Sequence, residues 1–364
     1  MTAGAAAQAG TGRDAASARR IYVTDCEGPL TKNDNAQEIA ERFVPDGAEV
    51  FARLSRYDDL LADVVRKPGY NAGDTLRLVP PFLKAFSVTD EDVDLFSAEQ
   101  VLLVPEALKT LGAVSALMPA YIISTSYTPY LKALCALAGF PMERVRCTEL
   151  SLDAWEMPED EAAWLRETAT RVLARPVIAI PDGARSADDL SAKDRETVAE
   201  LDDLFWTQMQ GRVSGEMVAA VRPVGGGQKL AALEAIIAAE DVEGGGVMYV
   251  GDSITDAPPL EAVKAWGGVS LSFNGNGYAI AAAEFAAASP DAEVQAQLAQ
   301  AFAAGGRNAV EAAVRAWPKP KKDTPARGKA RATVGVVADA REALAEASAA
   351  ARRSVRGEQV ARLG

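Results

Sequence analysis

The sequence predicts an α/β fold in which helices cover a parallel β-sheet. Short runs of apolar, β-favouring residues lie within 21–25, 120–126 and 246–256, and helical periodicity follows each run. Strands that alternate with helices in this way form parallel sheets. Each run also ends in polar residues, as expected where ligands bind at the carboxyl ends of parallel strands.

The first strand leads into a long helical segment. Residues 35–65 carry apolar side chains at helical spacing. The Pro and Gly residues of "RKPGYNAGD" (66–74) predict a loop. More helical sequence extends to about residue 103, and "SVTDED" (87–92) has the composition of a helix start.

Helices and strands then alternate. A helix is predicted to begin at Pro105, and the helix after the strand 120–126 is predicted to end at Gly139. A third strand is expected within 144–150. Residues 151–221 are acidic and mainly helical.

The last third of the chain continues this pattern. The Gly-rich turn of "GGGQKLAALEAIIAAE" (225–240) begins a helix with apolar residues on one face. Strands are predicted within 246–256 and 267–277. Beyond about residue 300 we expect Ala-rich helices that are interrupted by a basic linker (318–329).

Composition excludes several kinds of chemistry. The 364 residues include no histidine, so Ser-His-Asp catalysis, Cys-His catalysis and His-bound zinc are ruled out. The net charge of −13 argues against nucleic acid or an anionic membrane as a partner. The spacing of Cys26, Cys135 and Cys147 fits no disulfide or zinc pattern. We therefore expect a reduced, cytoplasmic protein.

Acids, hydroxyls and one lysine gather at the predicted ends of strands and the start of a helix. These residues are Asp25, Glu27, Ser124, Lys229, Asp252 and Asp256. Carboxylates that meet at one edge repel each other, and a divalent cation such as Mg²⁺, which prefers oxygen ligands, would relieve the repulsion. Ser124 and Lys229 are suitable donors to phosphoryl oxygens, and Asp25 is suited to act as a carboxylate nucleophile.

These motifs, in this order, resemble the haloacid dehalogenase-like (HAD) superfamily of phosphohydrolases, and most closely its phosphoserine-phosphatase-like branch. "DCEGPL" is similar to the first motif, Asp-x-Asp, with Glu27 at the second acidic position. "YIIST", "GGGQK" and "VGDSITD" resemble the second, third and fourth motifs. The resemblance implies a Rossmann-like parallel sheet core, with a helical cap between the first and second motifs and a second, mainly helical insertion.

The resemblance also implies a Mg²⁺-dependent phosphatase that forms an aspartyl-phosphate. Asp25 would attack phosphorus, and Glu27 would act as general acid and then as general base. Ser124 and Lys229 would hold the phosphoryl oxygens. The implied Mg²⁺ ligands are Asp25, the main-chain carbonyl of Glu27, Asp252 and Asp256.

Several of these residues also fit a purely structural role. Acids after strands often cap helices, and Lys229 fits a surface lysine in the first turn of a helix. Ser124 is one of three consecutive hydroxyls, so Thr125 is kept as a substrate-binding candidate. Asn274 resembles a position near the phosphate in the phosphoserine-phosphatase-like branch, but a turn at "FNGNG" explains it equally well.

We expect a cap that closes over a small phosphorylated metabolite and contacts its non-phosphate end. Loops carry recognition more often than helix faces do. Arg66 and Lys67, beside the 66–74 loop, are therefore the predicted contacts for a second anionic or strongly polar group.

The predicted organisation assigns each segment one role. The assignments are a disordered tail (1–19), a catalytic core (20–32, 104–150 and 222–300), a helical cap (33–103), a helical insertion (151–221) and C-terminal helices with a basic linker (301–364). "TDCEGPLTKNDNAQEIAE" also resembles archaeal proteins labelled energy-converting hydrogenase A subunit R, which are HAD-like. The alternative function is a weakly active or inactive regulatory or scaffold subunit that acts through protein partners. The sequence also leaves open whether the protein forms a homodimer.

Overall fold

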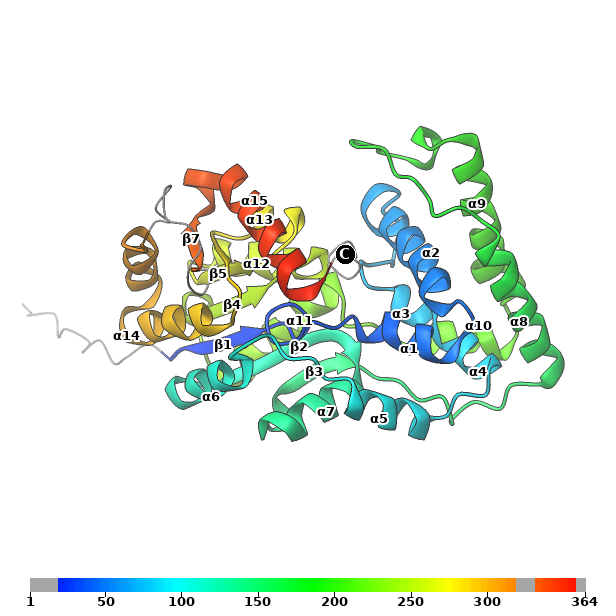
Figure 1. The fold of residues 1–364 in the computed structure, drawn as a ribbon, viewed down its shortest axis with the longest axis horizontal. Helices are drawn as coiled ribbons and strands as arrows, with labels where there is room; N and C mark the ends of the chain where they lie inside the picture. The colour runs from blue at the N-terminus through cyan, green and yellow to red at the C-terminus, as the bar shows by residue number, and fades with distance from the viewer. Residues whose placement is uncertain (1–18, 319–330, 358–364) are drawn as a thin grey trace, which may run out of the picture.

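The computed structural model describes residues 19–318 and 331–357, which form two parts that lie side by side (Figure 1). One part is a β-sheet with helices on both faces, and the other consists of helices. The predicted tail (1–19) lies outside the described residues apart from Arg19, and so does the predicted basic linker apart from Pro318.

A seven-stranded sheet forms the centre of the first part. Its order is β3-β2-β1-β4-β5-β6-β7, with the first six strands parallel and β7 antiparallel to β6. The strands are β1 (Ile21–Thr24), β2 (Ala120–Tyr127), β3 (Val145–Thr148), β4 (Val247–Gly251), β5 (Val269–Phe273), β6 (Phe285–Ala288) and β7 (Thr333–Val336). The predicted α/β class with a Rossmann-like, mostly parallel sheet is confirmed.

Helices cover both faces of this sheet. The helices of this part are α6 (Ala107–Leu117), α7 (Thr128–Ala138), α11 (Gly226–Glu240), α12 (Ala257–Ala265), α13 (Gly277–Ala282), α14 (Glu293–Arg315) and α15 (Val337–Arg356). Tyr22 of β1 packs in a cluster with residues of α6, α7 and α14, whereas Ile21 and Val23 pack with residues of α11 and α12. The residues of β1 are therefore buried on both faces, which explains its continuous apolar run.

The second part is built from two segments that are far apart in the sequence. Its helices are α1 (Asn35–Phe43), α2 (Gly47–Asp59), α3 (Thr75–Leu78), α4 (Pro80–Ala85), α5 (Asp90–Glu99), α8 (Glu159–Leu173), α9 (Ala192–Asp203) and α10 (Val213–Ala220). Two π-helical turns, Leu60–Val64 and Leu204–Gln208, extend α2 and α9. One hydrophobic cluster contains buried residues from both 36–93 and 152–218, so the two helical segments share one core.

Local sequence signals set several helix ends. Thr89 caps α5, because its side chain accepts from Asp92 N (3.1 Å) and the Asp92 side chain accepts from Thr89 N (3.0 Å). Gly139 ends α7 with a φ of 61°, a conformation that favours glycine. Both ends lie where the sequence predicts them. Short 3₁₀ turns lie at Met142–Arg144, Ala187–Asp189, Gly244–Gly246 and Ile254–Asp256.

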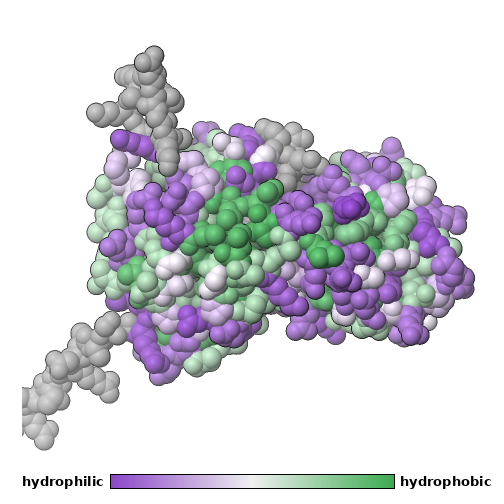
Figure 2. Space-filling view, turned by 60° about the horizontal axis from the view of Figure 1, so that its bottom comes forward, coloured by the Kyte–Doolittle hydropathy of each residue, from purple (hydrophilic) through white to green (hydrophobic). Residues whose placement is uncertain are grey.

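Figure 2 shows an apolar area in the middle of the visible face, bordered by polar side chains. Within the described part of the chain, no helix is both long enough and apolar enough to span a bilayer.

Candidate active site

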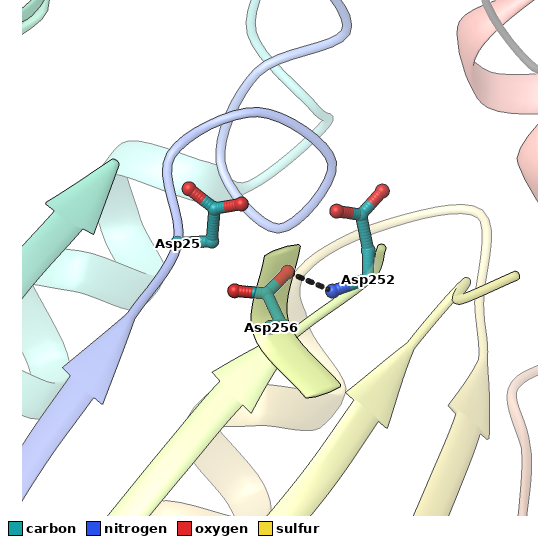
Figure 3. Close-up of side chains that lie close together, drawn as sticks. All are labelled: Asp25, Asp252 and Asp256. Carbon is teal, nitrogen blue, oxygen red and sulfur yellow. Dashed lines mark hydrogen bonds between the residues drawn. The ribbon is translucent and has the colours of Figure 1, made fainter. Parts of the chain in front are cut away.

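The sheet order brings the acids of the first and fourth motifs together. β1 and β4 are neighbours, and Thr24 pairs with Val250. Asp25 and Asp252 directly follow these strands, so they lie at the same edge of the sheet. Figure 3 shows their carboxylates side by side, with Asp256 below them on the following turn. One carboxylate oxygen from each of the three lies within 4.8 Å of the other two.

Asp256 is held by hydrogen bonds on both of its oxygens. Oδ2 accepts from the backbone N–H groups of Asp252 (2.9 Å) and Ser253 (3.1 Å). Oδ1 accepts from the Tyr249 hydroxyl (2.8 Å) and from Lys229 Nζ (2.8 Å). These contacts fix the turn after β4, so Asp256 mainly positions its neighbours.

Lys229 lies between two of the acids. It is in the first turn of α11, has no solvent exposure, and places Nζ 2.7 Å from Asp25 Oδ2. Burial lowers the pKa of Lys229, but the carboxylates of Asp25 and Asp256 outweigh burial and raise it. The alternative of a surface lysine is therefore wrong, and the ammonium stays charged.

Asp25 is the most strongly constrained acid of the first motif. Its Oδ1 accepts from Cys26 N (2.6 Å), and its Oδ2 faces Lys229. Burial raises the pKa of Asp25, and the charge of Lys229 lowers it. The charges of Asp256 and Asp252 raise it further, so the pKa lies above its usual range. A cation bound beside Asp25 would lower this pKa and favour the ionised form that a nucleophile needs.

Asp252 has two partners that the sequence motifs do not include. Arg352 and Arg356 of α15 both donate to its Oδ2, the latter at 3.1 Å. On another side, the carboxylate lies against Gly28, where an added Cβ would be 2.2 Å from Asp252 Oδ2. The φ of Gly28 is +99°, so the glycine of "DCEGPL" is required both for its backbone conformation and for space.

Glu27 lies next to the three-carboxylate cluster but is not part of it. Its Oε1 accepts from Asn35 N (2.9 Å) at the start of α1. Burial and the charge of Asp34 raise the pKa of Glu27 to about 8, although Arg356 opposes the rise. A carboxyl group with this pKa is largely protonated at neutral pH, so it can donate a proton.

The hydroxyl cluster at the end of β2 divides into different roles. Ser124 is buried, and its hydroxyl bonds with the Ser126 hydroxyl (3.1 Å) and accepts from Ser126 N (3.2 Å). The Thr125 hydroxyl donates to Val224 O (3.0 Å), which ties β2 to the segment before α11. All three residues line the cavity described next. Unlike the Thr125 hydroxyl, those of Ser124 and Ser126 do not bond to the segment before α11.

A cavity of about 120 Å³ lies where the two parts meet. The sheet part and the loops that follow its strands contribute Asp25, Glu27, Asp34, Ser124, Thr125, Ser126, Asp252, Ser253, Ile254, Thr255, Arg352 and Arg356. The helical part contributes Ala36, Phe51, Ser55, Asp58, Asp59, Gly73, Thr75 and Leu76. Among these lining residues, the helical part supplies acids and hydroxyls but no lysine or arginine.

Three predicted substrate contacts lie elsewhere. Asn274 bridges two loops, donating from Nδ2 to Ser289 O (2.8 Å) and accepting from Ser289 N (2.8 Å). Arg66 is exposed and donates to Asp63 O (3.3 Å), and Lys67 Nζ lies 3.9 Å from the centre of the Trp206 ring. None of the three is among the described residues that line the cavity, and for Asn274 the turn explanation accounts for its contacts.

Sequence reasoning missed the two arginines. They follow Leu344 and Ser348 at intervals of four residues, so they continue the buried stripe of α15. The four-residue spacing could have indicated that both arginines lie on the buried face of the helix. It does not indicate which end of the sheet the helix reaches. The segment also lies about one hundred residues beyond the last motif.

Comparisons with known proteins give matches over most of the chain. The structure of gene product AF1437 from Archaeoglobus fulgidus is 28% identical with a TM-score of 0.80, and the match covers 95% of this chain and 99% of that chain. A substrate-bound phosphoserine phosphatase (11% identical) and a phospho-aspartyl intermediate analogue of phosphoserine phosphatase (12%) both have TM-scores of 0.43. They cover 74% and 73% of this chain and 92% of their own chains. No protein-family model and no curated protein matches.

Proposed function

We propose that this protein is a Mg²⁺-dependent phosphatase of the HAD superfamily that hydrolyses a small phosphorylated metabolite. The observation that carries the proposal is the convergence of all four motifs at the carboxyl edge of the sheet. There Asp25 contacts Lys229 at 2.7 Å, and Asp25, Asp252 and Asp256 place oxygens within 4.8 Å of one another. The resemblance to hydrogenase subunit R-like proteins stays a prediction.

The donor set fits a hard divalent cation. Its ligands are carboxylate oxygens, which Mg²⁺ prefers. Asp25 and Asp252 would hold the ion, together with the main-chain carbonyl of Glu27, while Asp256 orients the turn that carries Asp252. When bound, Mg²⁺ would neutralise part of the charge on the phosphoryl oxygens.

The residues gathered at this edge of the sheet then divide the reaction between them. An Asp25 oxygen attacks phosphorus, the bond between phosphorus and the leaving oxygen breaks, and Glu27 donates its proton to that oxygen. Glu27, now ionised, takes a proton from water, and the resulting hydroxide attacks the phosphorus of the aspartyl-phosphate. Phosphate leaves and Asp25 is restored. Ser124 and Lys229 hold the phosphoryl oxygens throughout.

The cavity wall formed by the helical part indicates what the rest of the substrate offers. Ser55, Asp58, Asp59 and Thr75 supply hydrogen-bond acceptors and hydroxyls. Hydroxyl or ammonium groups on the substrate would be matched by this wall, which offers no lysine or arginine to a second anion. This replaces the role expected for Arg66 and Lys67, which lie away from the lining.

One observation favours the alternative of a weakly active or inactive subunit. Asp252, a proposed ligand of the cation, already has two guanidinium partners. A protein that never exchanges these partners for a cation would keep the fold and lack turnover. The apolar surface area in Figure 2 would then be available to a protein partner.

A screen of phosphorylated metabolites separates the two functions. The wild-type protein and Asp25→Asn are each incubated with Mg²⁺ and with EDTA, and phosphate release is measured. We expect release by the wild type with Mg²⁺ only, and none by the variant. Equal release by both proteins, or none by the wild type over the whole panel, would favour the subunit.

A further inference from the structure

We propose that Arg352 and Arg356 form a latch that competes with a divalent cation for Asp252 and ties the helical part to the sheet. The inference rests on the proposed function in one respect, since it takes Asp252 as a ligand of the cation. It adds a regulatory role for the C-terminal helix, which lies outside the four motifs.

The packing of α15 on the sheet part places its C-terminal end at the site. The helix packs on β6 and α13 through a cluster of Ile280, Ala286, Val337 and Leu344. Its buried stripe then continues through Ser348 to Arg352. In Figure 1, α15 (red) crosses the sheet part and ends beside the junction with the helical part. The two arginines therefore reach the cavity from a helix that is packed on the sheet part.

Both guanidinium groups converge on one oxygen. Arg352 Nη1 donates to Asp252 Oδ2 and also to Asp252 O (3.3 Å). Arg356 Nη1 donates to the same Oδ2 (3.1 Å). The side chains of Arg352, Arg356 and Asp252 are only 5%, 6% and 2% exposed, so water contributes little to their solvation. Charges buried in this way are stable only as partners of each other.

Arg356 also holds the segment that connects the two parts. Its Nε donates to Lys32 O (3.1 Å), and its Nη2 donates to Asn33 O. The next residue, Asp34, is the N-cap of α1, whose Gln37 N donates to its side chain (3.1 Å). One guanidinium group thus joins Asp252 to the first connection between the sheet part and the helical part.

A cation at Asp252 would change this arrangement. A divalent ion and two guanidinium groups on one carboxylate repel each other, and low solvent exposure strengthens the repulsion. Cation binding must therefore weaken the arginine contacts. Loss of the Arg356 contacts would in turn free the segment 32–34, so that helical-part movement and cation binding are linked.

Cation affinity tests the competition without any substrate. Mg²⁺ is titrated calorimetrically into the full-length wild type, the double variant Arg352→Gln/Arg356→Gln and the control Arg341→Gln. Arg341 lies on the same helix, is exposed and does not line the cavity, so the control reports the general effect of removing a positive charge. We expect at least tenfold tighter binding by the double variant and a change below threefold in the control.

Several outcomes would overturn the latch. They are equal or weaker binding by the double variant, an equal gain in the control, and no Mg²⁺ binding by either the wild type or the double variant. Circular dichroism first confirms folding, and the single variant Arg352→Gln replaces the double variant if the latter is unfolded. Because no turnover is measured, failure of the phosphatase proposal is distinguishable from failure of the latch.

Hydrogen exchange tests the link to the connecting segment. We expect amides of residues 32–37 to exchange at least threefold faster when the wild type is saturated with Mg²⁺. In the double variant, exchange should be fast with and without Mg²⁺. Unchanged protection of this segment in the wild type would contradict the link.

Discussion

Lys229 Nζ lies 2.7 Å from Asp25 Oδ2, and the lysine has no solvent exposure. The same nitrogen lies 2.8 Å from Asp256 Oδ1, so one buried cation holds two acids that come from different strands. A first-motif acid and a fourth-motif acid are therefore oriented by the third motif. The stability of the fold and the geometry of the candidate site depend on the same contact.

Lys229→Met should destabilise the protein strongly. The methionine fills a similar volume but leaves Asp25 and Asp256 without their cation. Removing one partner from a buried ion pair typically costs about 3–5 kcal/mol. We expect a loss of that size in the free energy of unfolding, measured by urea denaturation in EDTA. The exposed Lys264 of α12 provides the control Lys264→Met, and a loss below about 1 kcal/mol for Lys229→Met would contradict the expectation.

Asp25→Asn should abolish turnover while keeping the fold. The amide has nearly the shape of the carboxylate, and its oxygen can still face Lys229, but it is a poor nucleophile. Loss of a nucleophile typically costs several orders of magnitude, so we expect a decrease on the order of 10³-fold or more in kcat. Phosphate release on the best substrate of the screen is the measurement. A variant that keeps a tenth of the wild-type rate would exclude Asp25 as the nucleophile.

Glu27→Gln should lower turnover by about 10²–10⁴-fold, the usual value of general acid–base catalysis. The glutamine can still accept from Asn35 N, so the start of α1 should be unchanged. The loss should be larger for an alkyl phosphate than for p-nitrophenyl phosphate, whose leaving group needs no proton. Equal losses on both substrates would point to a structural role for Glu27.

The sequence predicts the sheet and the acids well because both depend on local patterns. β1, β2 and β4 each begin with an apolar run, and Asp25 and Asp252 directly follow β1 and β4. β6 has the sequence "FAAA", and alanine is depleted in strands, so its identity as a strand depends on burial within the sheet. Such burial is visible only once the sheet has formed.

Contacts between distant segments explain what the sequence could not predict. Arg352 meets Asp252 across one hundred positions of the chain, and no local pattern records that contact. The 66–74 loop shows the same limit. Its basic residues do not line the cavity. Gly73, at its other end, lies against the sheet part, where an added Cβ would be 2.9 Å from Thr125 Cγ2. Which end of a loop faces the site depends on how the two parts pack.

Arg66→Ala with Lys67→Ala should leave KM within about twofold of the wild-type value. Arg66 is exposed, and Lys67 packs on the Trp206 ring and lies 3.9 Å from Asp202. Cation–π contacts of this kind are worth about 0.5–1 kcal/mol, so a small loss of stability is expected instead. KM for the best substrate and the thermal midpoint are measured together. A tenfold rise in KM would restore the loop as a recognition element.

Asp58 is an acid of the helical part that lines the cavity. It lies in α2, is 4% exposed, and accepts from Gly73 N through Oδ2 (2.9 Å). Its Oδ1 has no hydrogen-bond partner among the described residues. Burial raises the pKa of Asp58 to about 7, although the bond from Gly73 lowers it. The folded protein therefore binds a proton here that the unfolded chain, with a pKa near 3.9, has already lost.

This difference fixes the sign of the pH dependence. Between about pH 4 and pH 7 the folded state binds more protons than the unfolded state, so stability falls as the pH rises through that range. Asp58→Asn is neutral at every pH, so it removes the contribution of this side chain to the pH dependence of stability. Relative to the wild type, the variant should gain on the order of 2–4 kcal/mol in free energy of unfolding between pH 4.5 and pH 8. Urea denaturation at both pH values measures the gain, and Asp182→Asn, at an exposed acid, should show none. If the Asp58 and Asp182 variants follow the same pH dependence, Asp58 is already ionised in the folded protein at the lower pH.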